Sequence, residues 1–239
     1  MNLIIDQGNT LFKVALFRDN ELISKEKFKY SDIDLFYDWL KNKNLKKLNI
    51  IVSSVVNTEI DLSNYEINKL IRLDFNTKLP IRNNYKTPKT LGVDRIANAV
   101  AAWQLNPNKN SMVIDFGTCI KYDIVNSKGE YVGGNISLGL NMRYKALNHF
   151  TDKLPLLKQS NLDVNYGIDT ETSLKCGVQL AIEHEIKGFV DSYTKEFGQL
   201  TIFMTGGDSK YFDKSFKNHI FANSNLTLIG LNEILKHNA

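Results

Sequence analysis

A short apolar run that stops at an Asp-x-Gly turn occurs twice in this chain, and it constrains the possible folds more than any other feature. The first run, Leu3–Ile5, ends at Asp6-Gln7-Gly8, and the second, Met112–Ile114, ends at Asp115-Phe116-Gly117, 109 positions later. In both places a second apolar strand follows, then turn residues, then a third strand. The recurrence predicts an α/β protein built from two β-β-β-α halves related by duplication.

A polar segment, Asn106-Pro107-Asn108-Lys109-Asn110, separates the two halves and is the best candidate for a domain boundary. We therefore expect lobes at residues 1–109 and 110–239. The continuous apolar run Leu48–Val56 predicts a strand buried on both faces, which favours parallel pairing. Apolar periodicity predicts helices around 36–40, 63–69, 93–105, 140–150, 170–195 and 226–236, and additional strands around 70–73 and 200–204.

The composition argues against several classes of protein. The 239 residues carry 30 basic and 26 acidic side chains, a net charge of +4 that is scattered along the chain, so neither a nucleic-acid nor a membrane partner is expected. No apolar run approaches the ~20 residues of a membrane span, and the first residues lack the basic segment of a signal peptide. Cys119 and Cys176 suit neither a disulfide framework nor a zinc site. A soluble protein of the reducing cytoplasm is expected.

The residues of the first turn are suited to binding a phosphate chain. Gly8 allows a tight turn whose backbone N–H groups face an anion, Asp6 offers an oxygen ligand to Mg²⁺, and Lys13 adds a positive charge. A single turn of this kind is more often an ordinary hairpin. Because Asp115 and Gly117 repeat the design, we expect the two turns to face each other across a cleft and to hold the β- and γ-phosphates of a nucleotide.

The segment Leu91-Gly92-Val93-Asp94-Arg95 opens an alanine-rich helix and leaves two interpretations open. Asp94 is either a helix-start carboxylate favoured by the helix dipole or a general base beside Arg95, whose guanidinium can bind a carboxylate or phosphate with two hydrogen bonds. Two glycine clusters are further candidates. Thr205-Gly206-Gly207-Asp208 permits close approach to a flat group such as adenosine, and Gly133–Gly139 precedes a helix whose N-terminus would attract an anion.

Taken together in chain order, these motifs resemble those of the type III pantothenate kinases, which belong to the superfamily of acetate and sugar kinases, heat-shock chaperones and actin. The block from Tyr85 to Arg95, next to two Asp-Gly hairpins, is the most specific part of the resemblance. The motifs that carry it are Asp6-x-Gly-Asn-Thr-x-x-Lys13, Tyr85-x-x-Pro-x-x-Leu-Gly-x-Asp-Arg95, Asp115-x-Gly-Thr118, Gly133-Gly-x-Ile and Thr205-Gly-Gly-Asp.

The resemblance implies an actin-like ATPase fold of two ribonuclease-H-like lobes with the active site in the cleft between them. It also implies a homodimer and the ATP-dependent phosphorylation of pantothenate to 4′-phosphopantothenate, the first step of coenzyme A synthesis. By position, Asp94 would accept the proton, Asp115 would hold a monovalent cation (K⁺ or NH₄⁺), and Mg²⁺ would accompany ATP. The residues implied for ATP are Asp6, Gln7, Gly8, Asn9, Thr10, Leu11, Phe12, Lys13 and Thr118, and those implied for pantothenate are Tyr85, Gly92, Val93, Asp94, Arg95 and Thr170.

One motif departs from the family pattern. The family's glycine cluster usually continues to a Pro-Gly pair, whereas Leu138-Gly139 stands here. Two alternatives also stay open on sequence alone. The chain could be a kinase for another small hydroxylated substrate such as a sugar, or a non-catalytic regulator of the same fold.

Overall fold

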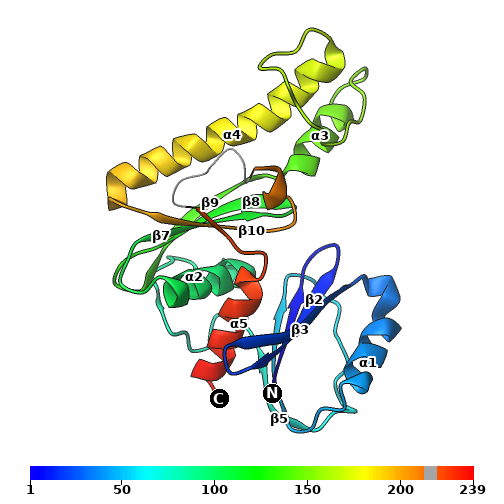
Figure 1. Cartoon of the computed structure of the whole chain (residues 1–239), viewed down its shortest axis with the longest axis vertical. Coiled ribbons are helices and arrows are strands. Elements are labelled where there is room, and N and C mark those ends of the chain that lie inside the picture. Colours follow the sequence, from blue (N-terminus) through cyan, green and yellow to red (C-terminus); the bar gives the residue numbers. More distant parts are fainter. Residues whose placement is uncertain (213–219) are drawn as a thin grey trace. The chain divides into compact units, whose positions relative to one another are not determined.

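The chain forms two compact units. A computed structural model describes residues 1–212 and 220–239 (Figure 1). The first unit comprises Met1–Asn108, Ser127–Gly133 and Asn225–Ala239, and the second comprises Lys109–Asn126 and Gly134–Ser224. The sequence places the C-terminal helix in the second lobe, whereas its contacts lie within the first unit. The predicted lobes follow the sequence repeat, whereas the two units are defined by contacts, so the units do not test the lobe boundaries. The lobes 1–109 and 110–239 remain a prediction.

The first unit is built on a five-stranded sheet with the order β3-β2-β1-β4-β5. Strand β1 pairs antiparallel with β2 and parallel with β4, so it lies in the middle of the sheet, and all of its residues are buried. The strands are β1 (Asn2–Gln7), β2 (Phe12–Arg18), β3 (Glu21–Phe28), β4 (Leu48–Ser54) and β5 (Ile67–Arg72).

Alternation along β1 sends its side chains to two different helical layers. Leu3 and Ile5 belong to the core that includes Phe36 and Leu40 of α1 (Ile33–Asn42), which follows the short 3-10 helix η1 (Tyr30–Asp32). Asn2 lies on the opposite face and donates from Nδ2 to Oδ1 of Asn232 on α5 (Leu226–His237) at 2.9 Å. Asp6 shares this second face because strand side chains alternate.

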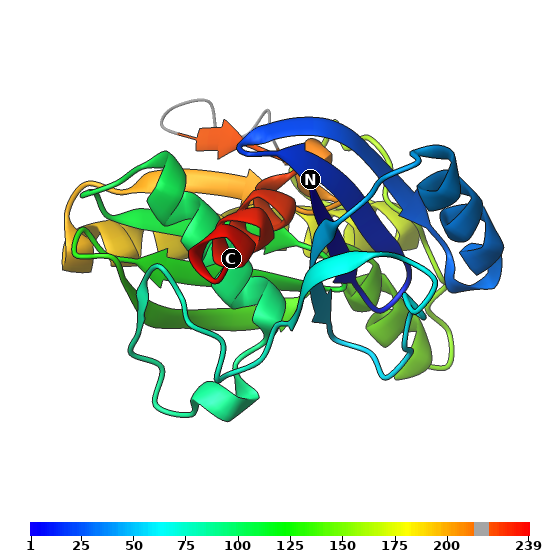
Figure 2. The same ribbon diagram turned by 90° about the horizontal axis from the view of Figure 1, so that it is seen from below.

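Helix α5 packs against α2 (Val93–Leu105) within the first unit, as Figures 1 and 2 show. The Thr227 hydroxyl donates to Oδ1 of Asn98 at 2.8 Å, and both side chains are buried. This contact fixes the helix whose first turn carries Asp94. Ahead of α2 the chain forms the short strand β6 (Arg82–Asn83), which pairs with Glu130 and Tyr131, and the 3-10 helix η2 (Pro88–Thr90).

The second unit repeats the arrangement of strands. The order β11-β10-β7-β8-β9 matches β5-β4-β1-β2-β3, with β7 antiparallel to β8 and parallel to β10. This equivalence confirms the predicted α/β fold of two duplicated, ribonuclease-H-like lobes. The strands are β7 (Ser111–Phe116), β8 (Cys119–Val125), β9 (Glu130–Leu138), β10 (Thr201–Thr205) and β11 (Ile220–Ala222).

Two helices cover one face of the second sheet. Helix α3 (Leu140–His149) and the long α4 (Thr170–Phe197) share a core with Met112, Ile114 and Tyr122. A 3-10 helix, η3 (Ser209–Tyr211), follows β10. Across the part of the chain that the structure describes, no helix has the length and apolarity that crossing a bilayer requires.

Most of the predicted elements are confirmed, but the helix expected around residues 63–69 is wrong. The chain turns near Ser63 and Asn64 and then enters β5 at Ile67. The polar residues Asn68 and Lys69 interrupt the apolar pattern that would have indicated a strand. Parallel pairing with β4 nevertheless makes this segment the edge strand β5.

Candidate active site

The turn between β1 and β2 is held in one shape by backbone hydrogen bonds. The Gly8 N–H donates to the Leu11 carbonyl at 3.1 Å, and the Tyr30 hydroxyl donates to the Gly8 carbonyl at 2.7 Å. Asn9 and Thr10 lie at the exposed tip. The turn is therefore preorganised, and it presents backbone and short polar groups to solvent.

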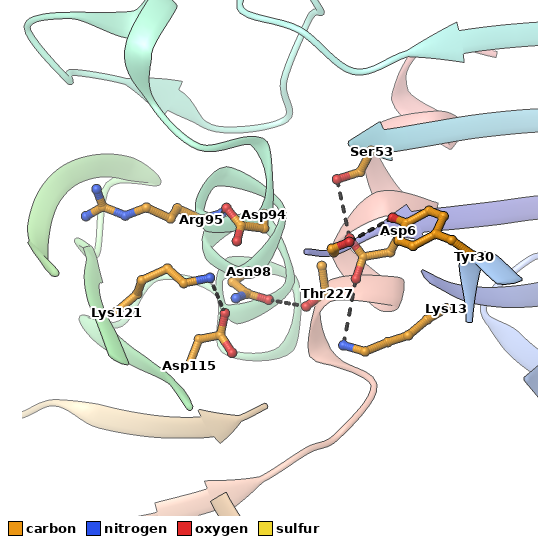
Figure 3. Close-up of polar contacts among 11 residues, drawn as sticks. Asp6, Lys13, Tyr30, Ser53, Asp94, Arg95, Asn98, Asp115, Lys121 and Thr227 are labelled. Carbon is orange, nitrogen blue, oxygen red and sulfur yellow. Dashed lines mark hydrogen bonds and ion pairs between the residues drawn. The ribbon is translucent and has the colours of Figure 1, made fainter. Parts of the chain in front are cut away.

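Asp6 lies at the base of this turn and is 8% exposed. Its carboxylate is 3.7 Å from the Lys13 ammonium, its cross-strand partner on β2, and it accepts a hydrogen bond from the Ser53 hydroxyl at 3.5 Å (Figure 3). Burial, and secondly the negative charge of Asp6, raise the pKa of the Tyr30 hydroxyl. Tyr30 therefore stays a hydrogen-bond donor at neutral pH.

Two residues implied for ATP direct their side chains away from the turn. The Gln7 amide donates to the Thr58 carbonyl at 2.8 Å, and the Phe12 ring packs against Phe28 and Phe36 in the core. Any contact of these positions with a nucleotide must come from their backbone.

The first turn of α2 brings Asp94, Arg95 and Tyr85 together. Asp94 accepts a hydrogen bond at Oδ1 from the Arg95 backbone N–H at 2.9 Å, which fixes its rotamer at the helix start. Arg95 is 4% exposed, and its guanidinium carbon lies 5.8 Å from the centre of the half-buried Tyr85 ring. Gly92 is the N-cap, and Val93 is the first helical residue. The Asp94 carboxylate is thus fixed by the helix start, whereas the Arg95 guanidinium extends away from it (Figure 3) and lies over an aromatic face.

The turn between β7 and β8 in the second unit follows the same plan. The Gly117 N–H donates to the Cys119 carbonyl at 3.1 Å, and Thr118 is exposed at the tip. Asp115 is 9% exposed, and its Oδ2 accepts a hydrogen bond from the Lys121 ammonium at 2.7 Å (Figure 3). The acidic residue of this turn is therefore already paired with a cation.

Two glycines support the Asp115–Thr118 turn from outside. The Gly139 N–H donates to the Thr118 carbonyl at 3.1 Å, and a Cβ on Gly139 would lie only 2.3 Å from that oxygen. Gly206, with φ of +94°, approaches Phe116 so closely that a Cβ would lie 2.3 Å from its carbonyl oxygen. Only glycine permits both approaches.

A polar network holds the segment that carries Gly139. Arg143 on α3 donates from Nε to the Leu138 carbonyl at 2.9 Å and forms an ion pair with Glu185 on α4 at 2.5 Å. Glu185 also accepts hydrogen bonds from the Tyr122 hydroxyl at 2.7 Å and the Ser137 hydroxyl at 3.0 Å. The network connects β8, β9, α3 and α4, and it fixes the loop that has Leu138 in place of the family's proline.

Thr170 is the first residue of α4 and lines a pocket of about 680 Å³ in the second unit. Asp169 caps the helix by accepting from the Thr172 backbone N–H at 2.8 Å, and the hydrogen bonds from Thr172 lower the pKa of the Asp169 carboxyl. The pocket is lined by Leu147, Leu154, Gly167, Ile168, Asp169, Thr170, Ser173, Leu174 and Gly177.

The oxygen ligands suit a metal that arrives with a nucleotide. Among the described residues no group of three or more His, Cys, Asp or Glu side chains is placed to hold a metal ion. Mg²⁺ is commonly bound by one or two carboxylates together with substrate phosphates and water. Asp6, at the base of an open turn, fits that pattern.

Sequence reasoning missed four residues of these sites: Tyr30, Ser53, Lys121 and Arg143. Tyr30 and Ser53 reach the first turn from other elements, and no local pattern indicates that they do. Lys121 had a detectable signal, because it stands across the hairpin from Asp115 as Lys13 stands across from Asp6.

Two mixed sheets that share a five-strand order, each with an Asp-Gly turn between its first two strands, define the actin-like ATPase fold. The sequence model of the family described as "Type III pantothenate kinase" matches residues 2–192. The type III pantothenate kinase of Christiangramia forsetii is 44% identical, over 100% of this chain and 99% of that protein. The chain therefore belongs to the type III pantothenate kinase family and is a kinase.

Two solved structures support the fold alone. A Campylobacter jejuni protein described as a Baf family transcriptional activator has a TM-score of 0.66 at 23% identity, covering 99% of this chain and 98% of that one. The activator of the 2-hydroxyisocaproyl-CoA dehydratase of Clostridium difficile, solved with bound ADPNP, has a TM-score of 0.54 at 12% identity, covering 98% and 93%.

Proposed function

We propose that this chain transfers the γ-phosphoryl group of ATP to the primary hydroxyl of pantothenate and so forms 4′-phosphopantothenate. The observation that carries the proposal is the start of α2, where the Arg95 backbone fixes Asp94 and the Arg95 guanidinium lies over the Tyr85 ring. Membership of the type III pantothenate kinase family supports the choice of substrate.

The first hairpin is proposed to bind the ATP phosphates. Asn9 and Thr10 are exposed at the tip of the hairpin, and Lys13 adds a positive charge that is 28% exposed. Asp6 would hold Mg²⁺, which neutralises phosphate charge when it is bound. Thr118 of the second hairpin is also proposed to bind ATP through its hydroxyl.

Asp94 is the proposed general base. Its carboxylate would accept the hydroxyl proton of pantothenate as the oxygen attacks the γ-phosphorus. Arg95 and Tyr85 would bind and orient pantothenate, because a guanidinium forms two parallel hydrogen bonds with a carboxylate. The residues proposed to complete the pantothenate site are Gly92, Val93 and Thr170.

The Asp115 carboxylate and a triphosphate are both negative and repel each other, so a positive charge beside Asp115 is needed if the nucleotide binds near it. The family resemblance implies that K⁺ or NH₄⁺ supplies this charge. The Lys121 ammonium is the other candidate, because it lies 2.7 Å from the carboxylate.

A coupled assay of ADP formation with pantothenate tests the proposal, and a panel of sugars and other hydroxylated substrates tests the alternative kinases. Asp94→Asn keeps the side-chain shape and removes the basicity, so kcat should fall by about 10²–10⁴. Asp34→Asn is the matched control, since Asp34 also lies in the first turn of a helix and is exposed. An equal change in kcat for the two variants would mean that Asp94 acts only as a helix-start carboxylate and not as the general base.

We further propose a homodimer formed through the end of the second unit that carries Thr170. Exposed apolar side chains gather in this part of the chain, and such patches commonly mark interfaces. Light scattering should give twice the 27.3 kDa chain mass. Ile168→Asp should halve the measured mass, whereas Leu35→Asp on α1 should not, although Leu35 is also exposed. The exposed residues of the patch are Phe150, Leu156, Val164, Tyr166 and Ile168.

The cytoplasm is the proposed location. ATP is available there, and the free thiols of Cys119 and Cys176 suit a reducing compartment.

A further inference from the structure

The Asp115 carboxylate is occupied by a cation that the chain itself supplies. The Lys121 ammonium lies 2.7 Å from Asp115 Oδ2, and the two side chains are only 16% and 13% exposed. The residues face each other across the β7–β8 hairpin in register, so the sheet itself brings them together (Figure 3). The contact is therefore a property of the strand pairing.

The equivalent pair in the first hairpin is looser. Lys13 lies 3.7 Å from Asp6 and is 28% exposed, so its ammonium is available to an approaching phosphate. The Lys121 ammonium is instead held against the Asp115 carboxylate. The duplicated hairpins have thus diverged in the use of their lysines.

A second monovalent cation beside this pair would be repelled by the Lys121 ammonium. K⁺ at Asp115 would have to displace the Lys121 ammonium or share one carboxylate with it, and two positive charges at that separation repel each other. The lysine ammonium is a compact point charge with three donors, so it can supply beside Asp115 the charge that NH₄⁺ would supply. The donor set thus disagrees with the monovalent cation implied by the family resemblance.

We propose that Lys121 takes the place of the monovalent cation, so that nucleotide binding and phosphoryl transfer in this chain require neither K⁺ nor NH₄⁺. The inference rests on the proposed kinase function. Lys121 is a positioning residue in this account, since it holds Asp115 and offsets its charge rather than contacting the reacting atoms.

The test compares rates in potassium chloride and in tetramethylammonium chloride at constant ionic strength and constant Mg²⁺. The unaltered protein should work equally in both salts, within about twofold. Lys121→Met keeps the length of the side chain and removes its charge. In tetramethylammonium this variant should lose at least tenfold in kcat/KM for ATP, and K⁺ or NH₄⁺ should restore the loss.

Three further variants keep the result interpretable. Lys121→Arg retains the charge and should remain independent of K⁺. Lys121→Thr is a second neutral variant with a side chain suited to a strand, and it replaces Lys121→Met if that protein does not fold. Lys187→Met removes an exposed lysine of α4 and should behave as the unaltered protein in both salts.

Binding of a fluorescent ATP analogue provides a readout that does not depend on turnover. Its affinity should be independent of K⁺ in the unaltered protein and should become K⁺-dependent in Lys121→Met. A tenfold or larger requirement of the unaltered protein for K⁺ would overturn the inference, and so would a neutral variant that K⁺ does not rescue. Absence of pantothenate turnover in every salt would refute the proposed function instead, while nucleotide binding still tests Lys121.

Discussion

Gly139→Ala should damage nucleotide binding through a steric contact that is visible in the structure. A Cβ at this position would lie 2.3 Å from the Thr118 carbonyl oxygen and 2.5 Å from the Gly117 carbonyl oxygen. Both obstacles are backbone atoms, so no side-chain rotation relieves the clash. The turn that carries Thr118 must move by about 1 Å to reach an ordinary contact distance of 3.4 Å.

The size of the effect follows from the cost of overpacking. Forcing a methyl group into a close-packed contact costs about 1–3 kcal/mol. If the turn moves and the nucleotide must restore it, ATP affinity should fall by about fivefold to about 150-fold. If the turn does not move, the same energy should appear as a lower free energy of unfolding. Pantothenate affinity should change little, because Tyr85, Arg95 and Thr170 all lie outside the Gly117–Thr118 turn.

Titration with a fluorescent ATP analogue and urea unfolding together measure both outcomes. Gly188→Ala is the control, since Gly188 lies within α4 with no atom within 4 Å of an added Cβ. Alanine there should stabilise the protein by about 0.5–1 kcal/mol. Unchanged ATP affinity together with unchanged stability of Gly139→Ala would refute the role assigned to the Gly139–Thr118 contact.

Two other predictions concern the second unit. Burial raises the pKa of the Asp208 carboxyl in the folded protein above the unfolded value of 3.8, so ionisation of Asp208 destabilises the folded state. This destabilisation is absent below pH 3.8 and is fully present once the pH has risen through the folded-state pKa. Asp208→Asn should therefore be more stable than the unaltered protein at pH ~7 and equally stable at pH ~3, as measured by urea unfolding. Glu185→Gln should cost about 2 kcal/mol, less than for a fully buried pair, because the Arg143–Glu185 ion pair keeps some exposure. Glu196→Gln, at an exposed position of the same helix, should leave the unfolding midpoint unchanged.

The duplicated hairpin was predictable because its signals are local. Leu3–Ile5 and Met112–Ile114 are short apolar runs, and each ends at an Asp-x-Gly turn that the structure places between paired strands. The helix that begins at Val93 was predictable for the same reason, since its periodicity and its glycine start lie within a few residues.

Features that depend on distant parts of the chain were not predictable. Residues 63–69 resemble a helix in sequence because the pairing of β5 with β4 has no signal in the local order of apolar and polar residues. The contact of the C-terminal helix with α2, in which Thr227 bonds to Asn98, joins segments 129 residues apart and has no local signal. The Ser53 hydroxyl approaches Asp6 from a neighbouring strand, and only the strand order determines that contact.

The most direct measurement of the central claim is the identity of the product. The protein is incubated with ATP, Mg²⁺ and pantothenate, and the reaction is analysed by mass spectrometry. We expect pantothenate to gain one phosphoryl group with formation of an equal amount of ADP, and we expect both products to be greatly reduced with Asp94→Asn. ADP formation without phosphorylated pantothenate, or no reaction at all by folded protein, would contradict the account.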